Sequence, residues 1–135
     1  MGSTLSLDEK VTVKRVREFF TDALPKLQLM ARIRLTSVSL DAMPTHHSND
    51  NTAVDKMTRQ VQARLYLDEM VEALSVLPDI ERRVITLKYI DGLQWFAISD
   101  RLHLSVRRLH EIMQQALNDF GVAYEGTLIL LYEDA

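Results

Sequence analysis

Residues 92–120 read Gly-Leu-Gln-Trp-Phe-Ala-Ile-Ser-Asp-Arg-Leu-His-Leu-Ser-Val-Arg-Arg-Leu-His-Glu-Ile-Met-Gln-Gln-Ala-Leu-Asn-Asp-Phe, and this stretch decides the fold. Apolar residues recur one helical turn apart, as in Ile98 and Leu102, and again after a short interruption. Ser105 is a good N-cap for the second helix because its hydroxyl can accept a backbone N–H. The spacing predicts a helix-turn-helix, an arrangement that can place a short helix in the major groove of DNA.

The predicted turn lacks the glycine that such turns usually contain, where one residue adopts a positive φ. His103 holds that place, and we expect it to adopt the left-handed conformation at some cost. Leu104 follows, and we expect it to fill the angle between the two helices. Gly92 is expected to end the preceding helix with a left-handed cap.

The charge of the predicted motif is neutral, with six cations and six acids between Asp79 and Gly121. DNA-binding proteins gain much of their affinity by neutralising phosphates, so this motif would need dimerisation, a flanking basic segment or a protein partner. Residues 1–35 are the basic end, with seven cations and four acids. Candidates for phosphate contacts there, each with a solvated helix face as the competing interpretation, are Lys10, Lys14, Arg15, Arg17, Lys26, Arg32 and Arg34.

Composition excludes several classes of protein. The chain has 135 residues, of which 47% are hydrophobic and 26% charged, as in a globular protein. The absence of cysteine excludes disulfides and thiolate metal sites and suits a reducing cytosol. No apolar run approaches the ~20 residues that span a bilayer. We therefore expect a cytoplasmic protein with no membrane association, and no bound metal at the adjacent His46 and His47.

The periodicity predicts an all-α fold in four parts. Residues 1–35 form a basic N-terminal helical arm interrupted at Pro25, and residues 36–51 a polar linker. Residues 52–126 form a helical domain that contains the helix-turn-helix; its first helix starts at Thr52, in a capping-box-like pattern with Asp55. Residues 127–135 are an apolar and then acidic tail, which could be a helix, a strand packed on the core, or a dimer contact.

The segment leading into the motif carries a family resemblance. Leu77-Pro78-Asp79-Ile80-Glu81-Arg82-Arg83-Val84-Ile85, followed by Leu87-Lys88-Tyr89-Ile90-Asp91-Gly92-Leu93, resembles the opening of region four of bacterial sigma factors. The fuller resemblance is to phage and prophage regulators of the ArpU type, which are similar to an isolated sigma region four. It rests on the polar linker leading into Val54-Asp55-Lys56-Met57, on Gly92-Leu93-Gln94-Trp95 and on Gln115-Ala116-Leu117-Asn118-Asp119-Phe120.

The resemblance implies a recognition helix over residues 106–115. Its exposed face would carry residues that can pair with base edges: arginine with guanine, glutamine with adenine, and glutamate with cytosine. These residues are Arg107, Arg108, His110, Glu111 and Gln114, with Ser105 at the cap. Arg107 and Arg108 are the main candidates, although Arg108 could instead pair with Glu111. Gln94 and Trp95 could contact a phosphate, but for Trp95 we favour a place in the core.

Two departures from the sigma pattern bear on function. Phe96 stands where such modules commonly carry acidic residues, so it could be buried against the long helix or exposed to polymerase or a second subunit. Nothing before Thr36 has the aromatic content of the module with which sigma factors hold core polymerase. We therefore do not expect a complete sigma factor.

The resemblance implies a DNA-binding transcriptional regulator of late phage or prophage genes. It would act on double-stranded promoter DNA in the bacterial cytoplasm, together with host RNA polymerase and as a monomer or homodimer. One alternative is a sigma-like module that binds polymerase or a phage protein without gripping DNA. Another is the small subunit of a packaging terminase. We expect no enzyme and no cofactor, because the sequence has no catalytic triad, glycine-rich phosphate loop or paired carboxylates.

Overall fold

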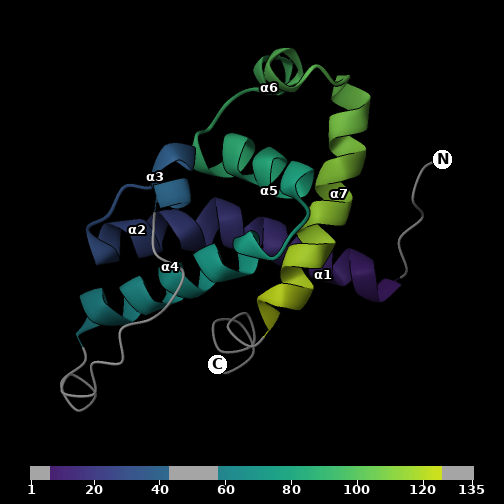
Figure 1. Cartoon of the computed structure of the whole chain (residues 1–135). Helices are drawn as coiled ribbons and strands as arrows, with labels where there is room; N and C mark the ends of the chain where they lie inside the picture. Colours follow the sequence, from purple (N-terminus) through teal and green to yellow (C-terminus); the bar gives the residue numbers. More distant parts are fainter. Residues whose placement is uncertain (1–6, 43–57, 126–135) are drawn as a thin grey trace.

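The computed structural model describes residues 7–42 and 58–125, and every regular element in those ranges is helical (Figure 1). The expected all-α fold is therefore confirmed. None of the described helices is both long and apolar enough to cross a membrane. In chain order the elements are α1 (Leu7–Glu18), η1 (Phe19–Ala23), α2 (Leu24–Ala31), α3 (Ser37–Ala42), α4 (Arg59–Ser75), α5 (Asp79–Ile85), η3 (Thr86–Ile90), α6 (Trp95–Leu102) and α7 (Val106–Ala123).

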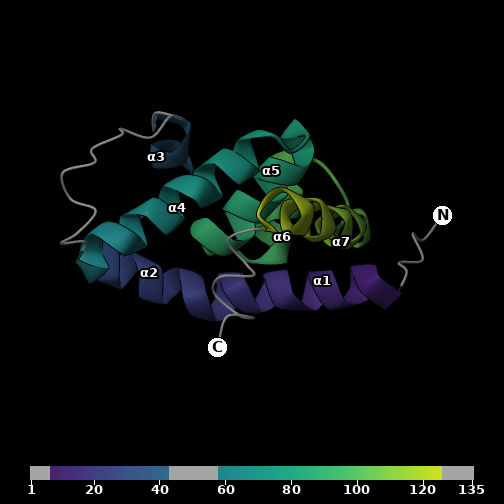
Figure 2. The same cartoon turned by 90° about the horizontal axis from the view of Figure 1, so that it is seen from below.

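The first three elements follow one another as a single long rod, which Figure 2 shows along one side of the molecule. Pro25 stands in the first turn of α2, directly after the wide π-helical turn of η1. A proline within a helix removes one backbone hydrogen bond and crowds the preceding turn, so a wider turn at this place accommodates it. The helix therefore continues past Pro25 and ends at Arg32, whose φ of 58° is left-handed.

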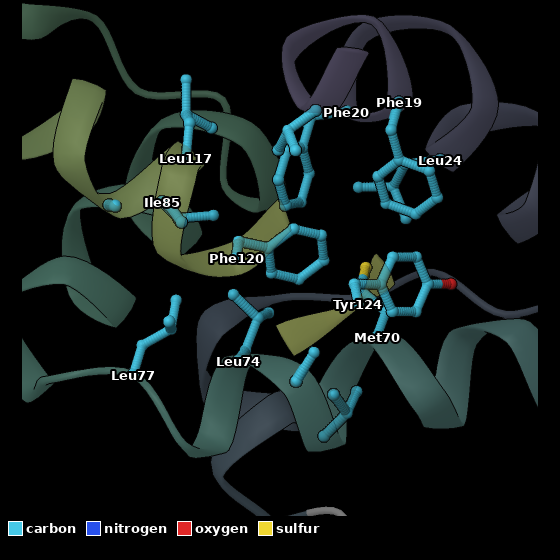
Figure 3. Packing of buried hydrophobic residues seen from close by; sticks show 14 of the residues in the cluster. Phe19, Phe20, Leu24, Met70, Leu74, Leu77, Ile85, Leu117, Phe120 and Tyr124 are labelled. Carbon is cyan, nitrogen blue, oxygen red and sulfur yellow. The ribbon is translucent and has the colours of Figure 1, made fainter. Parts of the chain in front are cut away.

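The rod is part of the hydrophobic core. Four aromatic rings meet where η1 crosses the C-terminal half of α7 (Figure 3). The ring centroids of Phe19 and Tyr124 lie 5.2 Å apart, and those of Phe20 and Phe120 lie 4.9 Å apart. The Tyr124 hydroxyl donates a 2.8 Å hydrogen bond to the Tyr66 carbonyl of α4. The segment predicted as a basic arm thus folds against the C-terminal half of α7 through its apolar side.

A close helix crossing holds α1 on α7. Gly121 of α7 is buried, and a Cβ atom there would overlap the methyl group of Thr12 and press on Val16. The absence of a side chain at Gly121 is therefore what lets α1 approach α7 at this point. Nearby, the Asn118 amide donates to the Glu9 carboxylate at 3.3 Å. Because of these contacts with α1, the C-terminal half of α7 is buried in the core.

The segment predicted as a linker is helical over part of its length. Thr36 and Ser39 exchange reciprocal hydrogen bonds at 2.8 and 3.0 Å, which start the short helix α3. Asp91 then holds its first residue, accepting from the Ser37 N–H at 2.8 Å and from the Ser37 hydroxyl at 2.6 Å. The prediction of an irregular linker is therefore wrong for residues 37–42, and residues 43–51 of that linker lie outside the described residues.

The long fourth helix starts later than predicted. It begins at Arg59, because Thr58 has extended backbone and its hydroxyl accepts the Val61 N–H at 3.2 Å. A start at Thr52 is thus wrong, and the proposed pairing of Thr52 with Asp55 lies outside the described residues, as does the C-terminal tail.

Candidate nucleic-acid interface

The helix-turn-helix consists of α6 and α7 joined by three residues. His103 adopts the left-handed conformation, with a φ of 58°, and its N–H donates to the Ser99 carbonyl, which closes α6. Across the turn, the Ser99 hydroxyl donates to the Leu104 carbonyl at 2.5 Å. The Ser105 hydroxyl accepts the Arg108 N–H at 3.1 Å. The left-handed conformation expected of His103 and the N-cap expected of Ser105 are both confirmed.

The first half of α7 presents a polar face to solvent. One side of the helix is buried in the core, through Leu109, Ile112, Met113, Ala116 and Leu117. On the other side the side chains of Arg107, Arg108, His110 and Gln114 are exposed, and Glu111 is half-buried. Figure 1 shows this part of α7 together with α6 extending beyond the remaining helices. The residues predicted for base contact therefore share one accessible surface.

Arg108 and Glu111 form the ion pair that the sequence offered as an alternative. The guanidinium and carboxylate atoms lie 3.3 Å apart, and the two side chains are 59% and 30% exposed. A pair as exposed as this contributes about 0–1 kcal/mol. Because that energy is small compared with a bidentate contact to guanine, which is worth about 1–3 kcal/mol, the ion pair leaves Arg108 available to a base.

Trp95 packs against the core and contacts His110 on the exposed face of α7. Its half-buried ring meets the edge of His110, with centroids 4.5 Å apart. The ammonium of Lys88 lies 5.0 Å from the Trp95 ring and 3.4 Å from the Leu93 carbonyl. The favoured place of Trp95 as a core anchor is confirmed. The sequence did not predict the contact of Lys88 with Trp95. The wide π-helical turn of η3 brings Lys88 next to α6, and no local sequence pattern indicates this contact.

The start of α6 is open to solvent. Gln94 is the exposed N-cap residue, and its side chain makes no capping hydrogen bond. Phe96 is 70% exposed, so the alternative in which it is buried against the long helix is wrong. It borders a shallow hollow that is also lined by Ala97, Ser99, Asp100 and Arg101.

The basic residues of the N-terminal arm are spread along the rod. Lys10, Lys14 and Arg17 are exposed on α1, and Arg15 there is half-buried. Since α1 crosses α7 at Gly121, these cations lie roughly 20 Å along α7 from its first turn. Arg32 and Arg34, both exposed, lie further along the rod, at the end of α2. The structure therefore does not bring these cations together with the start of α7, and their contact with phosphates stays a prediction.

The geometry above agrees with a comparison to known families. Residues 67–119 match the family model Sigma-70, region 4. That range runs from the middle of α4 through most of α7, which is less than half of the chain. The chain therefore carries a sigma region four-like helix-turn-helix, which suggests a role in DNA binding and transcription. Comparisons with curated proteins and with solved structures found no match.

Within the described ranges, no three histidine or carboxylate side chains gather where they could hold a metal ion. His46 and His47 lie outside those ranges.

Proposed function

We propose that this protein is a sequence-specific DNA-binding regulator of transcription, in which the first half of α7 enters the major groove. The observation that carries the proposal is the exposed face of α7, where Arg107 and Arg108 stand in the first turn beside α6. In helix-turn-helix proteins the N-terminal residues of the second helix contact base edges. Here that end of the helix is both accessible and polar.

The side chains on this face can distinguish base pairs. Arg107 and Arg108 can each donate two hydrogen bonds to guanine, and Gln114 can pair with adenine nearly two turns further along. Glu111 can accept from cytosine when Arg108 leaves it for a base. His110, whose ring is fixed against Trp95, offers a further donor or acceptor. These pairings give the module a means to read sequence.

Phosphate contacts would come from several places. The N-terminus of α6, at Gln94, offers backbone N–H groups to a phosphate, and Lys88 adds a positive charge close by. The motif itself is neutral, so it supplies little affinity by this route. The cations of α1 and α2 could add phosphate contacts if the DNA is bent toward them, or if they belong to a second copy of the chain bound nearby.

We also propose that the regulated genes are late genes of a phage or prophage, and that the protein acts with host RNA polymerase in the bacterial cytoplasm. The resemblance of the chain to ArpU-type regulators supports the phage assignment. The likeness to sigma region four supports a role beside polymerase, since that module works at promoters in contact with the enzyme. Phe96 is the residue we assign to the protein contact.

The test is DNA selection followed by affinity measurement. The full chain is used to enrich binding sites from a random duplex pool, and fluorescence anisotropy then compares variants at several salt concentrations. We expect Arg107→Ala/Arg108→Ala to lose about 100-fold in affinity for the selected site, since each base contact is worth about 1–3 kcal/mol. The matched control is Arg64→Ala/Arg83→Ala, which removes two exposed cations from α4 and α5.

We expect the control variant to stay within about threefold of the wild type, as for the loss of non-contacting surface charge. Circular dichroism confirms that both variants keep their helices. If no sequence is enriched even at low salt, or if both variants lose the same affinity, DNA reading by α7 is refuted.

The exposure of Phe96 favours one second candidate, a protein-interaction module that binds polymerase without gripping DNA. In that case Phe96→Ser would abolish retention of purified RNA polymerase holoenzyme by the immobilised protein, and no duplex would be enriched by the wild type. Under our proposal, Phe96→Ser keeps its affinity for the selected DNA, so the two functions are separable in one variant.

A further inference from the structure

An open apolar groove lies at the end of α2, away from the aromatic core. Its volume is about 640 Å³, and it is lined by Pro25, Gln28, Leu29, Arg32, Ile33 and Arg34. Leu29 is 79% exposed, the largest exposed fraction among the big hydrophobic side chains of the described ranges. The volume falls within the range of ligand-binding clefts, about 300–1,000 Å³, and like them the groove combines apolar lining with a few polar side chains.

The groove is fixed in shape by the turn that ends α2. Arg32 has a left-handed backbone with a φ of 58°, and its N–H donates to the Leu29 carbonyl at 3.2 Å. The Ile33 N–H donates to the Gln28 carbonyl at 3.0 Å, which completes a Schellman motif. The Gln28 side chain accepts the Leu35 N–H at 2.8 Å. Leu29 and Ile33 are thus held on one turn, so a partner does not have to order the groove when it binds.

The rim of the groove is positively charged. Arg32 and Arg34 line it and are exposed, and Lys26, next to Pro25 in the sequence, is exposed as well. No acidic residue of the described ranges lines the groove. The whole chain has a net charge of −3, so this group of cations is a local feature and does not reflect the overall charge. A ligand that complements the groove therefore carries negative charge beside its apolar part.

The apolar floor and the cationic rim together decide between the possible occupants. DNA phosphates would pair with Arg32 and Arg34 but would offer no apolar surface to Leu29 and Ile33. A second copy of the chain, docked through the same groove about a two-fold axis, would bring the same cations against each other. An amphipathic helix fits both properties, because it presents apolar side chains on one face and can carry acids beside them.

We propose that the α2 groove binds an acidic amphipathic helix of a partner protein. Apolar side chains of this helix pack on Leu29 and Ile33, and its carboxylates pair with Arg32 and Arg34. Docking removes the exposed face of Leu29 from water.

The groove is separate from the face of α7 assigned to DNA. Leu29 lies ten residues beyond Phe19 along the rod, roughly 15 Å at the helical rise. Phe19 packs on Phe120 in the C-terminal half of α7, whereas Arg107 and Arg108 stand in the first turn of that helix. Figure 2 shows α2 at the opposite end of the rod from α1. Partner binding therefore goes beyond the proposed DNA binding, and each can be tested without the other.

Selection from a peptide library tests the chemistry of the ligand. A displayed library of helical peptides, randomised on one face and its flanks, is enriched on the immobilised full chain. We expect the enriched peptides to carry apolar residues at helical spacing, flanked by aspartate and glutamate. Enrichment of no peptide, or only of basic or uncharged peptides, would overturn the proposal.

Affinities of the enriched peptides for two variants locate their site. Fluorescence anisotropy should show at least a tenfold loss for Leu29→Glu, because the new carboxylate stands on the apolar floor and repels the acids of the peptide. The matched control is Val76→Glu, which changes a 72% exposed side chain at the end of α4 and should stay within about twofold of the wild type. If no enriched peptide loses affinity for Leu29→Glu, the proposal is wrong.

Charge exchange tests the ion pairs. Arg32→Glu/Arg34→Glu should weaken an enriched peptide at least tenfold, whereas Arg64→Glu/Arg83→Glu, which changes two exposed arginines of α4 and α5, should stay within about threefold. The same peptide with its acids replaced by lysine should bind Arg32→Glu/Arg34→Glu at least fivefold more tightly than it binds the wild type. Failure of the lysine peptide to prefer the variant would refute the pairing, since structural damage would weaken both peptides.

The other occupants would give different results. Under the proposal, Leu29→Glu keeps the affinity of the wild type for the selected DNA and its oligomeric state in sedimentation. A loss of DNA affinity in Leu29→Glu without any enriched peptide would make the groove a DNA contact. A wild-type dimer that Leu29→Glu dissociates would make the occupant a second copy of the chain. Either result would overturn the proposal.

Discussion

Replacing Glu81 by glutamine should stabilise the protein in neutral and alkaline solution but hardly at all in acid. Glu81 is a buried residue of α5 that faces α7, and its Oε1 atom has no hydrogen-bond partner. Burial raises the pKa of its carboxyl group from 4.5 to about 7, helped by a hydrogen bond with Asp119 and by repulsion from that carboxylate. Asp119 in turn accepts from the Gln115 amide at 3.0 Å. The ionised form of Glu81 is therefore the unfavourable one.

The size of the effect follows from the two pKa values. Each pKa unit corresponds to about 1.4 kcal/mol, so ionised Glu81 makes folding roughly 3 kcal/mol less favourable than protonated Glu81 does. Between pH 4.5 and about 7 the folded state binds more protons at this site than the unfolded state. The free energy of unfolding therefore falls as the pH rises through this window, and this loss is complete above it.

The assay is urea denaturation of wild type and Glu81→Gln, followed by circular dichroism from pH 4.5 to pH 8. Glutamine resembles the protonated carboxyl group, so the two proteins should unfold with nearly equal free energies at pH 4.5. At pH 8 the variant should be more stable by roughly 3 kcal/mol. The exposed Glu18→Gln serves as the control, with an expected change within about 0.5 kcal/mol at both ends of the range. A difference that does not vary with pH, or a destabilised variant at pH 8, would refute the reasoning.

Three further substitutions test features of the fold by the same denaturation assay. His103→Gly should raise the free energy of unfolding by about 0.5 kcal/mol, because glycine relieves the strain of the left-handed backbone at some cost in entropy. An equal gain for His103→Ala would contradict this explanation. Gly121→Ala should lower the free energy of unfolding by about 1–3 kcal/mol, because the new methyl group overlaps the Thr12 methyl group. Adding Thr12→Ser should recover most of this loss. A Gly121→Ala variant at least as stable as wild type would mean that the crossing tolerates a side chain. Asp91→Ala should lower the free energy of unfolding by about 2 kcal/mol, because it removes both hydrogen bonds to Ser37. Amide hydrogen exchange in α3 should also become faster, and unchanged exchange there would argue against Asp91 as the anchor of α3.

The helix-turn-helix could be predicted residue by residue because its signals are local. A left-handed residue at His103, an N-cap at Ser105 and a positive φ at Gly92 each depend only on neighbouring residues, and all three are present in the structure. The exposed side of α7 likewise follows from helical periodicity. The roles of Arg107 and Arg108 in binding DNA depend on a partner, so they stay predictions.

The contacts between distant segments could not be predicted. An amphipathic helix shows which face it buries but does not show against what, so the packing of Phe19 on Phe120 has no signature in the sequence. The contact of Lys88 with Trp95 likewise depends on the wide turn of η3. The helix α3 is different, because its signal was present: Thr36 and Ser39 have the spacing of a reciprocal cap. There, the polar composition predicts a loop, whereas the local hydrogen bonds form a helix.

The crossing at Gly121 limits how far this helix-turn-helix could be moved to another protein. The segment that matches the sigma family ends at residue 119, just before Phe120, and leaves out the whole rod. Cut out at those bounds, α7 would lose its last residues, including Phe120 and Gly121, and with them its aromatic contacts and its crossing with α1. The segment that matches the family model is thus smaller than the unit that packs together, and grafting it into another scaffold would require the end of α7 and residues 7–35, or a substitute for them.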